Sequence, residues 1–410
     1  MRRRAFIGSV LATSIAGLAP GDVLAQRRRP GSRVVVVGAG AFGGWTALHL
    51  LRAGVRVTLI DAWGPGHSRA SSGGETRVIR HAYGKRIYVE LAKRSRELWL
   101  EAGSAWGRPV FFETGALHMR QPGPWDEFFE TAARLMTDAG VPFEQLGHDE
   151  LARRYPQLDA DGIESAIFEP GAGHLLARRA CQEVVDVFRR EGGDYRNAWV
   201  TPGAIVDGAL TGIELGDGEF QIADQFVFAC GPWLKGLFPD LLAGPLRVSR
   251  QEVFYFGVPP DERRYDMDRL PAWVDFGSNI WYGIPGGENR GFKLADDSHG
   301  PELDPSTTER RVTADGVERA RSYVGRRFPG LANAPLIESR VCQYTNTPDG
   351  DFIADRHPGA TNLWLLGGGS GHGFKHGPAL GEMMAEQVLG ERPFEPDFAL
   401  SRPALAGSRS

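Results

Sequence analysis

Cysteine is scarce in this chain, which has three among its 410 residues, at positions 181, 230 and 342. Because the set is odd in number and widely spaced, the sequence predicts neither a disulfide framework nor a zinc cluster, and we expect no metal site. Neither sign of charge dominates, since 51 acidic residues stand against 47 basic ones. The formal net charge of -4 therefore argues against a nucleic-acid partner.

The composition is that of an ordinary globular protein, with 42% hydrophobic and 24% charged residues. A chain of this length has room for two domains and a substantial core. Apolar alternation predicts a mixed β-sheet with strands at 110–119, 246–258, 280–284 and 291–294. Helical patterns cover 90–99, 125–139 and 178–190.

The first thirty residues, MRRRAFIGSVLATSIAGLAPGDVLAQRRRP, have the order of an export signal. A basic start precedes a weakly apolar stretch, Ala5 to Ala19, which is shorter than the ~20 residues needed to span a membrane. We therefore expect no stable membrane anchor. The order Arg3-Arg4-x-Phe6-Ile7 resembles a twin-arginine signal, which predicts export of the folded protein by that machinery to the periplasm or beyond, with cleavage after Ala25. A disordered basic tail is the alternative.

The strongest local pattern follows this segment. An apolar run at 34–37 leads into Gly38-x-Gly40-x-x-Gly43, then a helical stretch and a second strand that ends on Asp61. In such a βαβ unit the glycines allow a tight turn, close approach of a pyrophosphate, and close packing of helix on strand. Asp61 is placed to accept hydrogen bonds from a ribose. The pattern predicts a dinucleotide-binding domain.

Two later segments indicate which dinucleotide is bound. The stretch DQFVFACGPW delivers a turn of small residues at Ala229 and Gly231, and Cys230 between them is expected to be a small buried residue. Far down the chain, NLWLLGGGSGHGFKHGP ends a strand at Leu366 and starts a helix near Pro378. A nicotinamide enzyme needs no such second strand-loop-helix site. An extended FAD does.

Cys342 stands in the segment RVCQYTNTPDGDFIADRHP, in what the alternation predicts to be a strand. Turn residues at 348–350 and a second apolar run at 352–353 predict a hairpin-like crossing rather than a metal loop. On residue type alone, a single cysteine in a strand is usually a small buried hydrophobe.

Five further motifs, together with the glycine fingerprint, resemble one family. The chain is similar to monomeric sarcosine oxidase and N-methyltryptophan oxidase, a subfamily of the D-amino-acid-oxidase-like flavoproteins that also include fructosyl amino acid oxidases. The match covers nearly all of the chain after the signal. The motifs are SSGGETRVIRHAYG at 71–84, WYGIP at 281–285, GFKL at 291–294, RVCQYT at 340–345 and GSGHGFKHGP at 369–378.

The resemblance implies an α/β fold in which a Rossmann-like FAD-binding domain is interwoven with a mixed-sheet substrate domain. It also implies a monomer. After the signal at 1–30, we expect the FAD-binding domain at 31–112, 172–245 and 336–398. The substrate domain is expected at 113–171 and 246–335.

The resemblance also assigns residues to the cofactor. In the subfamily the cysteine of this strand carries FAD as a thioether, and Cys342 occupies the matching position. The alternative is a buried cysteine beside noncovalent FAD. Arg77 is expected near the flavin ring, and the glycine-rich loop adds Gly371, Gly373, Phe374 and Lys375.

The activity implied is oxidation of the C–N bond of an N-substituted or secondary amino acid, giving an imine and H₂O₂. Arg80 and Lys375 match the pair that holds the substrate carboxylate, as a guanidinium and an ammonium can. Tyr282 matches a tyrosine that lines the site, and Tyr344 lies two positions after Cys342 on the same strand face.

Lys293 is expected to promote the reaction with O₂, because a fixed positive charge stabilises negative charge that forms on oxygen. The same framework also serves dehydrogenases that pass electrons to a quinone or carrier, and this alternative stays open. Two positions depart from the family: Gly73 and Asp297 stand where sarcosine oxidases have histidines. Losing two imidazoles is expected to open space, and Asp297 adds negative charge, which favours a bulkier or more cationic substrate than sarcosine. The alternative is that Asp297 and the neighbouring Asp296 lie in a solvated turn.

Overall fold

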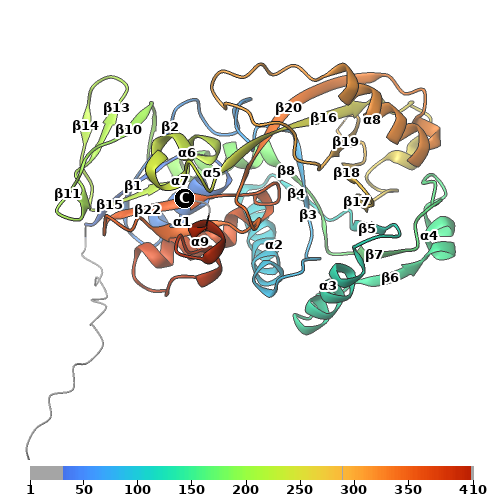
Figure 1. The fold of residues 1–410 in the computed structure, drawn as a ribbon, viewed down its shortest axis with the longest axis horizontal. Coiled ribbons are helices and arrows are strands. Elements are labelled where there is room, and N and C mark those ends of the chain that lie inside the picture. The colour runs from blue at the N-terminus through green and yellow to red at the C-terminus, as the bar shows by residue number, and fades with distance from the viewer. Residues whose placement is uncertain (1–30, 289, 408–410) are drawn as a thin grey trace, which may run out of the picture.

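The computed structural model describes residues 31–288 and 290–407. The expected export signal at 1–30 lies outside the described residues. The described part forms two lobes, each built on one large β-sheet (Figure 1). No described helix is long and apolar enough to cross a membrane.

The first lobe is a six-stranded, mostly parallel sheet with helices packed on it (Figure 1). Its elements are β1 Arg33–Val37, β2 Arg56–Asp61, β9 Asp194–Asn197, β15 Gln225–Phe228, β21 Ile353–Arg356, β22 Leu363–Gly367, α1 Ala41–Arg52, α5 Ala177–Arg190 and α9 Gly377–Val388. The strand order is β21-β22-β15-β1-β2-β9, and β1 pairs in parallel with β2 and β15. Helix α1 makes the crossover that a parallel pair requires. The predicted Rossmann-like unit is confirmed.

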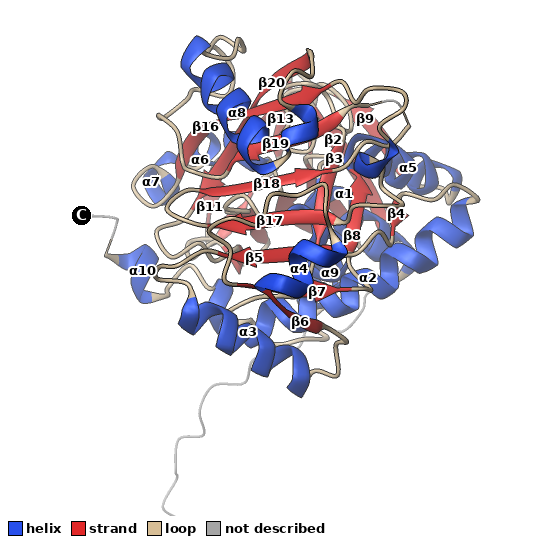
Figure 2. Cartoon of the chain, turned by 90° about the vertical axis from the view of Figure 1, so that its right-hand side faces the viewer, coloured by secondary structure: helices blue, strands red, loops and turns tan. Residues whose placement is uncertain are grey.

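The second lobe is an eight-stranded mixed sheet, and Figure 2 shows its strands β18, β17 and β5 side by side. Its elements are β5 Ala116–Arg120, β6 Glu144–Gly147, β7 Ser165–Glu169, β16 Arg247–Phe256, β17 Ala272–Phe276, β18 Ile280–Ile284, β19 Phe292–Asp296, β20 Leu336–Asn346, α3 Asp126–Asp138, α4 His148–Arg154 and α8 Ala314–Arg327. The order is β20-β16-β19-β18-β17-β5-β7-β6.

The two faces of this second sheet have different surroundings. On β16, Phe254 and Phe256 pack in the core beneath α8, together with Tyr323. The residues that alternate with them, Val253 and Tyr255, line a cavity between the lobes. Because side chains alternate along a strand, one strand both builds the core and forms the wall of the cavity.

A small third sheet joins the lobes and corrects one prediction. It consists of β3 Thr76–Ile79, β4 Phe111–Phe112 and β8 Gly173–Leu176, and α2 Arg86–Trp106 follows β3. The strand expected at 110–119 is in fact two strands, since β4 belongs to this sheet and β5 to the eight-stranded one. Gly115 separates them with a φ of +76°, a conformation that glycine adopts without strain.

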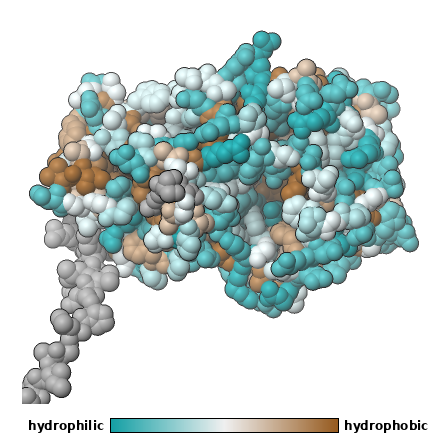
Figure 3. Space-filling model, in the orientation of Figure 1, coloured by the Kyte–Doolittle hydropathy of each residue, from teal (hydrophilic) through white to brown (hydrophobic). Residues whose placement is uncertain are grey.

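The remaining elements are short. Strands β10 Val200–Pro202, β11 Ile205–Val206, β12 Ala209–Leu210, β13 Ile213–Leu215 and β14 Phe220–Gln221 form an arm beside the first lobe, and the short helices are α6 Leu234–Leu237, α7 Pro239–Leu242 and α10 Pro403–Ala406. The arm exposes Ile205, Val206, Phe220 and Ile222. Figure 3 shows brown, hydrophobic atoms at its left edge, the side on which Figure 1 places this arm.

The segment around Cys342 crosses between lobes instead of forming a hairpin. β20 pairs with β16 in the eight-stranded sheet, whereas β21 pairs with β22 in the six-stranded one. The two strands flank the predicted turn but do not pair with each other. Residues 336–346, grouped from sequence with the FAD-binding segments, thus lie in the sheet of the other lobe.

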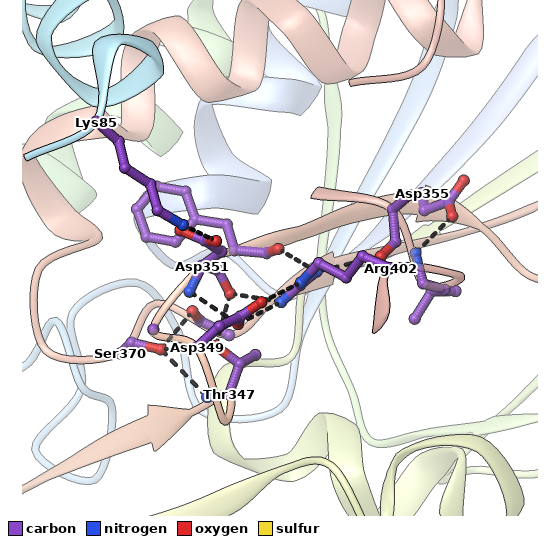
Figure 4. A network of polar contacts seen from close by, with 12 residues as sticks. Lys85, Thr347, Asp349, Asp351, Asp355, Ser370 and Arg402 are labelled. Atoms are coloured by element: carbon purple, nitrogen blue, oxygen red, sulfur yellow. Dashed lines mark hydrogen bonds and ion pairs between the residues drawn. The ribbon is translucent and has the colours of Figure 1, made fainter. Parts of the chain in front are cut away.

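This crossing is fixed by the chain's last described segment, as Figure 4 shows. Arg402 donates to the carbonyls of Asp351 and Phe352, both at 2.9 Å, and pairs with the Asp349 carboxylate at 2.8 Å. Thr347 Oγ1 donates to Asp351 O, and its main-chain N–H donates to Ser370 Oγ. The crossing is therefore tied to the glycine-rich loop that contains Ser370.

Candidate active site

A cavity of about 530 Å³ lies between the two sheets. The loop after β1 and the end of β2 line one part of it, and β16, β18 and β20 line another. Most predicted site residues line this cavity. They are Gly38, Gly40, Asp61, Arg77, Arg80, Ala229, Gly231, Tyr282, Cys342, Tyr344, Gly371, Gly373, Phe374 and Lys375.

The three fingerprint glycines each meet a different requirement. Gly38 has a φ of +103°, and a Cβ there would overlap the carbonyl of Ala229. A Cβ on Gly43 would overlap the carbonyl of Gly38, so this glycine lets α1 pack against the turn. Nothing lies within 4 Å of a Cβ placed on Gly40, which faces the open cavity. The geometry agrees with the roles that the fingerprint predicts.

Asp61 lines the cavity at the end of β2 and organises the loops around it. Its carboxylate accepts hydrogen bonds from the N–H groups of Ala39 (2.8 Å), Trp63 (2.9 Å) and Gly64 (2.8 Å). These bonds hold the fingerprint loop against the turn after β2. The ribose contact stays a prediction.

The turn after β15 brings Ala229 and Gly231 to the cavity, and Ala229 N–H donates to Val37 O at 2.8 Å. Burial raises the pKa of the neighbouring Cys230 thiol, whose Sγ donates to the same carbonyl at 3.5 Å. Burial also raises the pKa of Cys181 to about 12. Both thiols are therefore poor nucleophiles.

Cys342 has a different environment from the other two cysteines. Its Sγ lies on the cavity wall, 3.8 Å from Arg77 Nη2. Arg77 also donates to the carbonyl of Ser71, which lies 3.6 Å from the same sulfur. This is the electropositive, accessible position that covalent attachment would need.

The glycine-rich loop before α9 closes another side of the cavity. Gly371 has a φ of +81°, and its Cβ would lie 2.7 Å from the ring of Tyr344. A Cβ on Gly373 would lie 2.7 Å from the ring of Phe42. Phe374 stacks on Trp99, with ring centroids 5.9 Å apart. The loop thus brings its backbone up to the aromatic wall, and α9 begins directly after it at Gly377.

A chain of three polar side chains runs along the part of the cavity wall that the second lobe forms. Tyr282 and Tyr344 hydroxyls lie 3.2 Å apart, and Tyr344 donates to Asp297 Oδ1 at 2.8 Å. Burial raises the pKa of the Asp297 carboxyl to about 6, against the opposing effect of the Tyr344 hydrogen bond. Burial also raises the pKa of both tyrosines. The site therefore holds a carboxyl group that titrates near neutral pH.

The predicted carboxylate anchors come together around Tyr83. The ring centroid of Tyr83 lies 4.2 Å from Arg80 Cζ, and its hydroxyl accepts a hydrogen bond from Lys375 Nζ at 2.7 Å. Lys375 also donates to His372 O at 2.8 Å and is 5% exposed. Burial, and secondly Arg80, hold the pKa of Lys375 well below its usual range. An anion bound here would relieve that repulsion.

Lys293 is buried, as its position in a strand predicts, and is 2% exposed. Its Nζ donates to Thr76 O at 2.7 Å and lies 5.6 Å from the centroid of the Tyr282 ring. It faces a second, small cavity beside Tyr255 and His174. Burial, and secondly Arg77, hold its pKa well below the usual range.

The two departures from the family have unequal consequences. A Cβ on Gly73 would overlap the carbonyl of His67, and Gly73 does not line the cavity. The expectation that its missing imidazole opens space is therefore wrong, because the backbone itself fills that place. Asp297 does line the cavity, whereas its neighbour Asp296 pairs with Arg319 at 2.7 Å.

Sequence reasoning missed several residues of the site. Tyr83 lies inside the quoted motif SSGGETRVIRHAYG but was not singled out there, although it contacts both anchors. His376 Nε2 lies 3.0 Å from the Tyr83 hydroxyl, and His372 Nδ1 lies 3.4 Å from it. Glu169, at the end of β7, is fully buried behind Arg80, and nothing in its local sequence signals that position.

Comparison with known proteins supports the assignment of the fold and the cofactor. Residues 33–387 match the family model of the FAD-dependent oxidoreductases known as DAO. The chain belongs to the FAD-dependent oxidoreductase family. It is 33% identical to monomeric sarcosine oxidase of Bacillus sp. (strain B-0618) over 92% of this chain and 97% of that protein. It is 32% identical to N-methyl-L-tryptophan oxidase of Salmonella arizonae over 88% of this chain and 95% of that protein.

Two solved structures agree with this chain in fold. The fructosyl amine:oxygen oxidoreductase of Aspergillus fumigatus, Amadoriase I, superposes with a TM-score of 0.77 at 21% identity, over 93% of this chain and 92% of its own. L-proline dehydrogenase from P. horikoshii superposes with a TM-score of 0.77 at 22% identity, over 87% of this chain and 93% of its own.

The cavity of this FAD-dependent oxidoreductase suits its family's cofactor. The glycine turn opens to it, and a cation and a thiol lie on the same wall. Two residues that line the cavity, Ser71 and Gln343, each have a buried side-chain oxygen without a hydrogen-bond partner within the described part of the chain. Unpaired buried polar atoms point to a missing polar ligand. The residues present therefore fit FAD.

The raised pKa of Asp297 predicts a pH-dependent stability. An unfolded aspartate has a pKa of about 3.9, so ionisation of the folded carboxyl opposes folding increasingly as the pH rises from about 4 to 6. Asp297→Asn should remove that cost, and its gain in unfolding free energy should grow by about 2 kcal/mol between pH 4.5 and pH 8. Urea unfolding at both pH values measures this. Asp296→Asn, which breaks the ion pair with Arg319, should give no such gain, and an equal effect of Asp297→Asn at both pH values would contradict the assignment.

Proposed function

We propose that this protein is an exported FAD-dependent oxidase of the C–N bond of an N-substituted or secondary amino acid, producing an imine and H₂O₂. The observation that carries the proposal is the pair Arg80 and Lys375, which lies on the wall of the same cavity as the FAD fingerprint. The names of the relatives, sarcosine oxidase and N-methyltryptophan oxidase, support this class of substrate.

Arg80 and Lys375 would bind the substrate carboxylate. Both hydrogen bonds of Lys375 go to neutral acceptors, the Tyr83 hydroxyl and the His372 carbonyl. A carboxylate would therefore supply the missing negative charge and gain two charge-assisted contacts. Holding one end of an amino acid in this way orients the C–H bond beside its nitrogen.

FAD, when bound, would supply the electron acceptor that takes a hydride from the substrate and passes the electrons to O₂. The chain's part is to orient the substrate, keep water out and place charge. Tyr282 and Tyr344 would form the wall beside the substrate nitrogen, with Asp297 behind Tyr344. Because Asp297 replaces a family histidine with a carboxyl, a bulkier or more cationic amino acid than sarcosine suits this wall.

Lys293 would serve the reaction with O₂ on the other side of the wall. Its low pKa makes the ammonium costly until negative charge arrives nearby. Charge that develops on the oxygen molecule and the proton on Lys293 would therefore stabilise each other. Within the described residues, Lys293 donates one hydrogen bond, to a main-chain carbonyl, and so keeps donors free.

Lys293→Met should slow the oxygen half-reaction by a factor of roughly 100 to 1,000, since one preorganised electrostatic contact contributes roughly 3–4 kcal/mol. Reduction by substrate should change much less. Stopped-flow absorbance records the two half-reactions separately. Arg80→Ala is the matched control and should show the reverse pattern, with weak substrate binding and near-normal reaction with O₂.

The same measurement separates an oxidase from a dehydrogenase. If the parent reduces a quinone far faster than O₂, the protein is a dehydrogenase that uses a carrier. If the Lys293 variant reacts with O₂ as fast as the parent, the role proposed for Lys293 is wrong and the feature that argues against a dehydrogenase is lost. An H₂O₂ release screen against N-methyl, cyclic and side-chain-modified amino acids identifies the substrate.

Covalent attachment of FAD through Cys342 has a direct test. Acid precipitation of the parent should leave the yellow colour in the pellet, because a thioether survives denaturation. Cys342→Ser should release the flavin to the supernatant, whereas Cys230→Ser, at the other cavity-lining cysteine, should not. Flavin released from the unaltered protein would show that the cofactor is held without a covalent bond.

Export by the twin-arginine route is supported by the order Arg3-Arg4-x-Phe6-Ile7. A cofactor must be loaded before this kind of export, which suits a covalent flavin. Changing Arg3 and Arg4 together to lysine should retain the protein in the cytoplasm, as measured by cell fractionation. Changing Arg27 and Arg28 to lysine, beyond the expected cleavage site, is the control. Continued export of the first variant would point to another route.

A further inference from the structure

Glu169 is a fully buried carboxylate that the proposed reaction does not use directly. It ends β7 in the substrate lobe, and its relative exposure is 0%. It does not line the cavity. Buried charged groups are costly unless they are paired and fully hydrogen-bonded, so its presence there needs a reason.

The two oxygens of Glu169 accept four hydrogen bonds. Oε2 accepts from the main-chain N–H of His81 at 2.7 Å and lies 2.8 Å from His81 Nδ1. Oε1 accepts from the main-chain N–H of Ala82 at 3.0 Å and lies 2.8 Å from His118 Nε2. Burial raises the pKa of this carboxyl, but the hydrogen bonds from His118 and His81 outweigh it and hold the pKa well below the usual range. Glu169 is therefore ionised.

His118 completes the site as a neutral donor. Burial lowers its pKa, and its Nδ1 has no partner among the residues that the structure describes. A neutral ring with a proton on Nε2 satisfies both observations. The negative charge of Glu169 is thus spread over donors from β5 and from the segment after β3.

The main chain that Glu169 holds is the segment directly after Arg80. Ala82 connects Glu169 with Arg80 through its two main-chain polar groups. Its N–H donates to Glu169, and its carbonyl accepts from Arg80 Nη1. Tyr83 follows, and it contacts both Arg80 and Lys375. One carboxylate from a distant strand thereby fixes the segment that carries or contacts both anchors.

We infer that Glu169 is the positioning residue for the substrate-carboxylate anchor: by holding the His81 and Ala82 amides it sets the direction of Arg80 and the place of Tyr83. This inference rests on the proposed role of Arg80 and Lys375. Glu169 acts through these residues and does not touch the substrate itself.

Charge and position predict opposite effects for Glu169→Gln. If Glu169 acted only as a negative charge near Arg80 and Lys375, removing it would make the site more positive and strengthen carboxylate binding. If it positions the segment, the new amide NH₂ would face donors that it cannot accept from, the segment would shift, and carboxylate binding would weaken.

The test uses the flavin-loaded enzyme and a matched pair of ligands, furan-2-carboxylate and its uncharged analogue furan-2-carboxamide. Calorimetry measures the binding of each. The parent should bind the carboxylate more tightly than the amide. Glu169→Gln should weaken carboxylate binding at least tenfold and change amide binding by less than twofold. His118→Leu, which removes one of the four donors, should weaken carboxylate binding by three- to tenfold and serves if the first variant folds poorly.

Asp275→Asn is the control for loss of any buried carboxylate from the same sheet. Asp275 is also fully buried, accepts from Gln121 Nε2 and the Tyr323 hydroxyl at 2.7 Å, and does not line the cavity. Its variant should lose stability but change carboxylate binding by less than twofold. An equal loss of binding in Asp275→Asn would overturn the inference.

Arg80→Ala separates this inference from the proposed function. If Arg80→Ala weakens carboxylate binding but Glu169→Gln leaves it unchanged or tighter, the positioning role is wrong and the proposed function stands. If Arg80→Ala binds the carboxylate as tightly as the parent, the anchor itself is wrong, and the role of Glu169 falls with it.

Discussion

The burial of positive charge is the constraint on which the rest of this structure depends. Arg77, Arg80, Lys293 and Lys375 all lie in or beside the space between the two sheets, and the two lysines are almost completely buried. Desolvation makes the positive charge of each lysine costly, and an arginine beside each lysine raises that cost further. Such an arrangement is stable only if anionic groups, from the chain or from ligands, complete it.

The two-lobed architecture brings the residues of the site together from far apart in the sequence. The six-stranded sheet brings the fingerprint glycines and Asp61, and the eight-stranded sheet brings Cys342, Tyr344 and, through β7, Glu169. The chain passes between the lobes at β3 and again after β20. The buried Arg402 ties the second crossing in place. The cavity is therefore a property of the junction and belongs to neither lobe alone.

The two ends of the cavity hold different chemistry. Main-chain groups dominate near Gly38, where close approach of a backbone decides what fits. Titratable side chains dominate near Tyr344, where Asp297 titrates near neutral pH. A cofactor common to the family suits the first end, and selection of a substrate particular to this protein suits the second.

Local sequence predicted several helices and the glycine turn correctly. Helices expected at 125–139 and 178–190 are α3 Asp126–Asp138 and α5 Ala177–Arg190, because their apolar periodicity is a local property. The glycine fingerprint likewise predicted its own turn, since steric contact with Ala229 and Gly38 leaves no alternative residue. Local patterns failed where a strand changed sheets, at 110–119 and after Cys342, because alternation is the same in either sheet.

The sequence by itself determined the fold family and the cofactor, because the glycine fingerprint is a short spacing that the backbone translates directly into geometry. The residues expected to bind a carboxylate came from the resemblance to the family and stay a prediction. Only the tertiary structure decided that Gly73 opens no space, that Asp297 lines the main cavity, that Lys293 faces a cavity of its own and that Glu169 holds the segment after Arg80. Burial and hydrogen bonding of a side chain depend on partners from distant segments. No local pattern records those partners, and they are set when the two sheets close on each other.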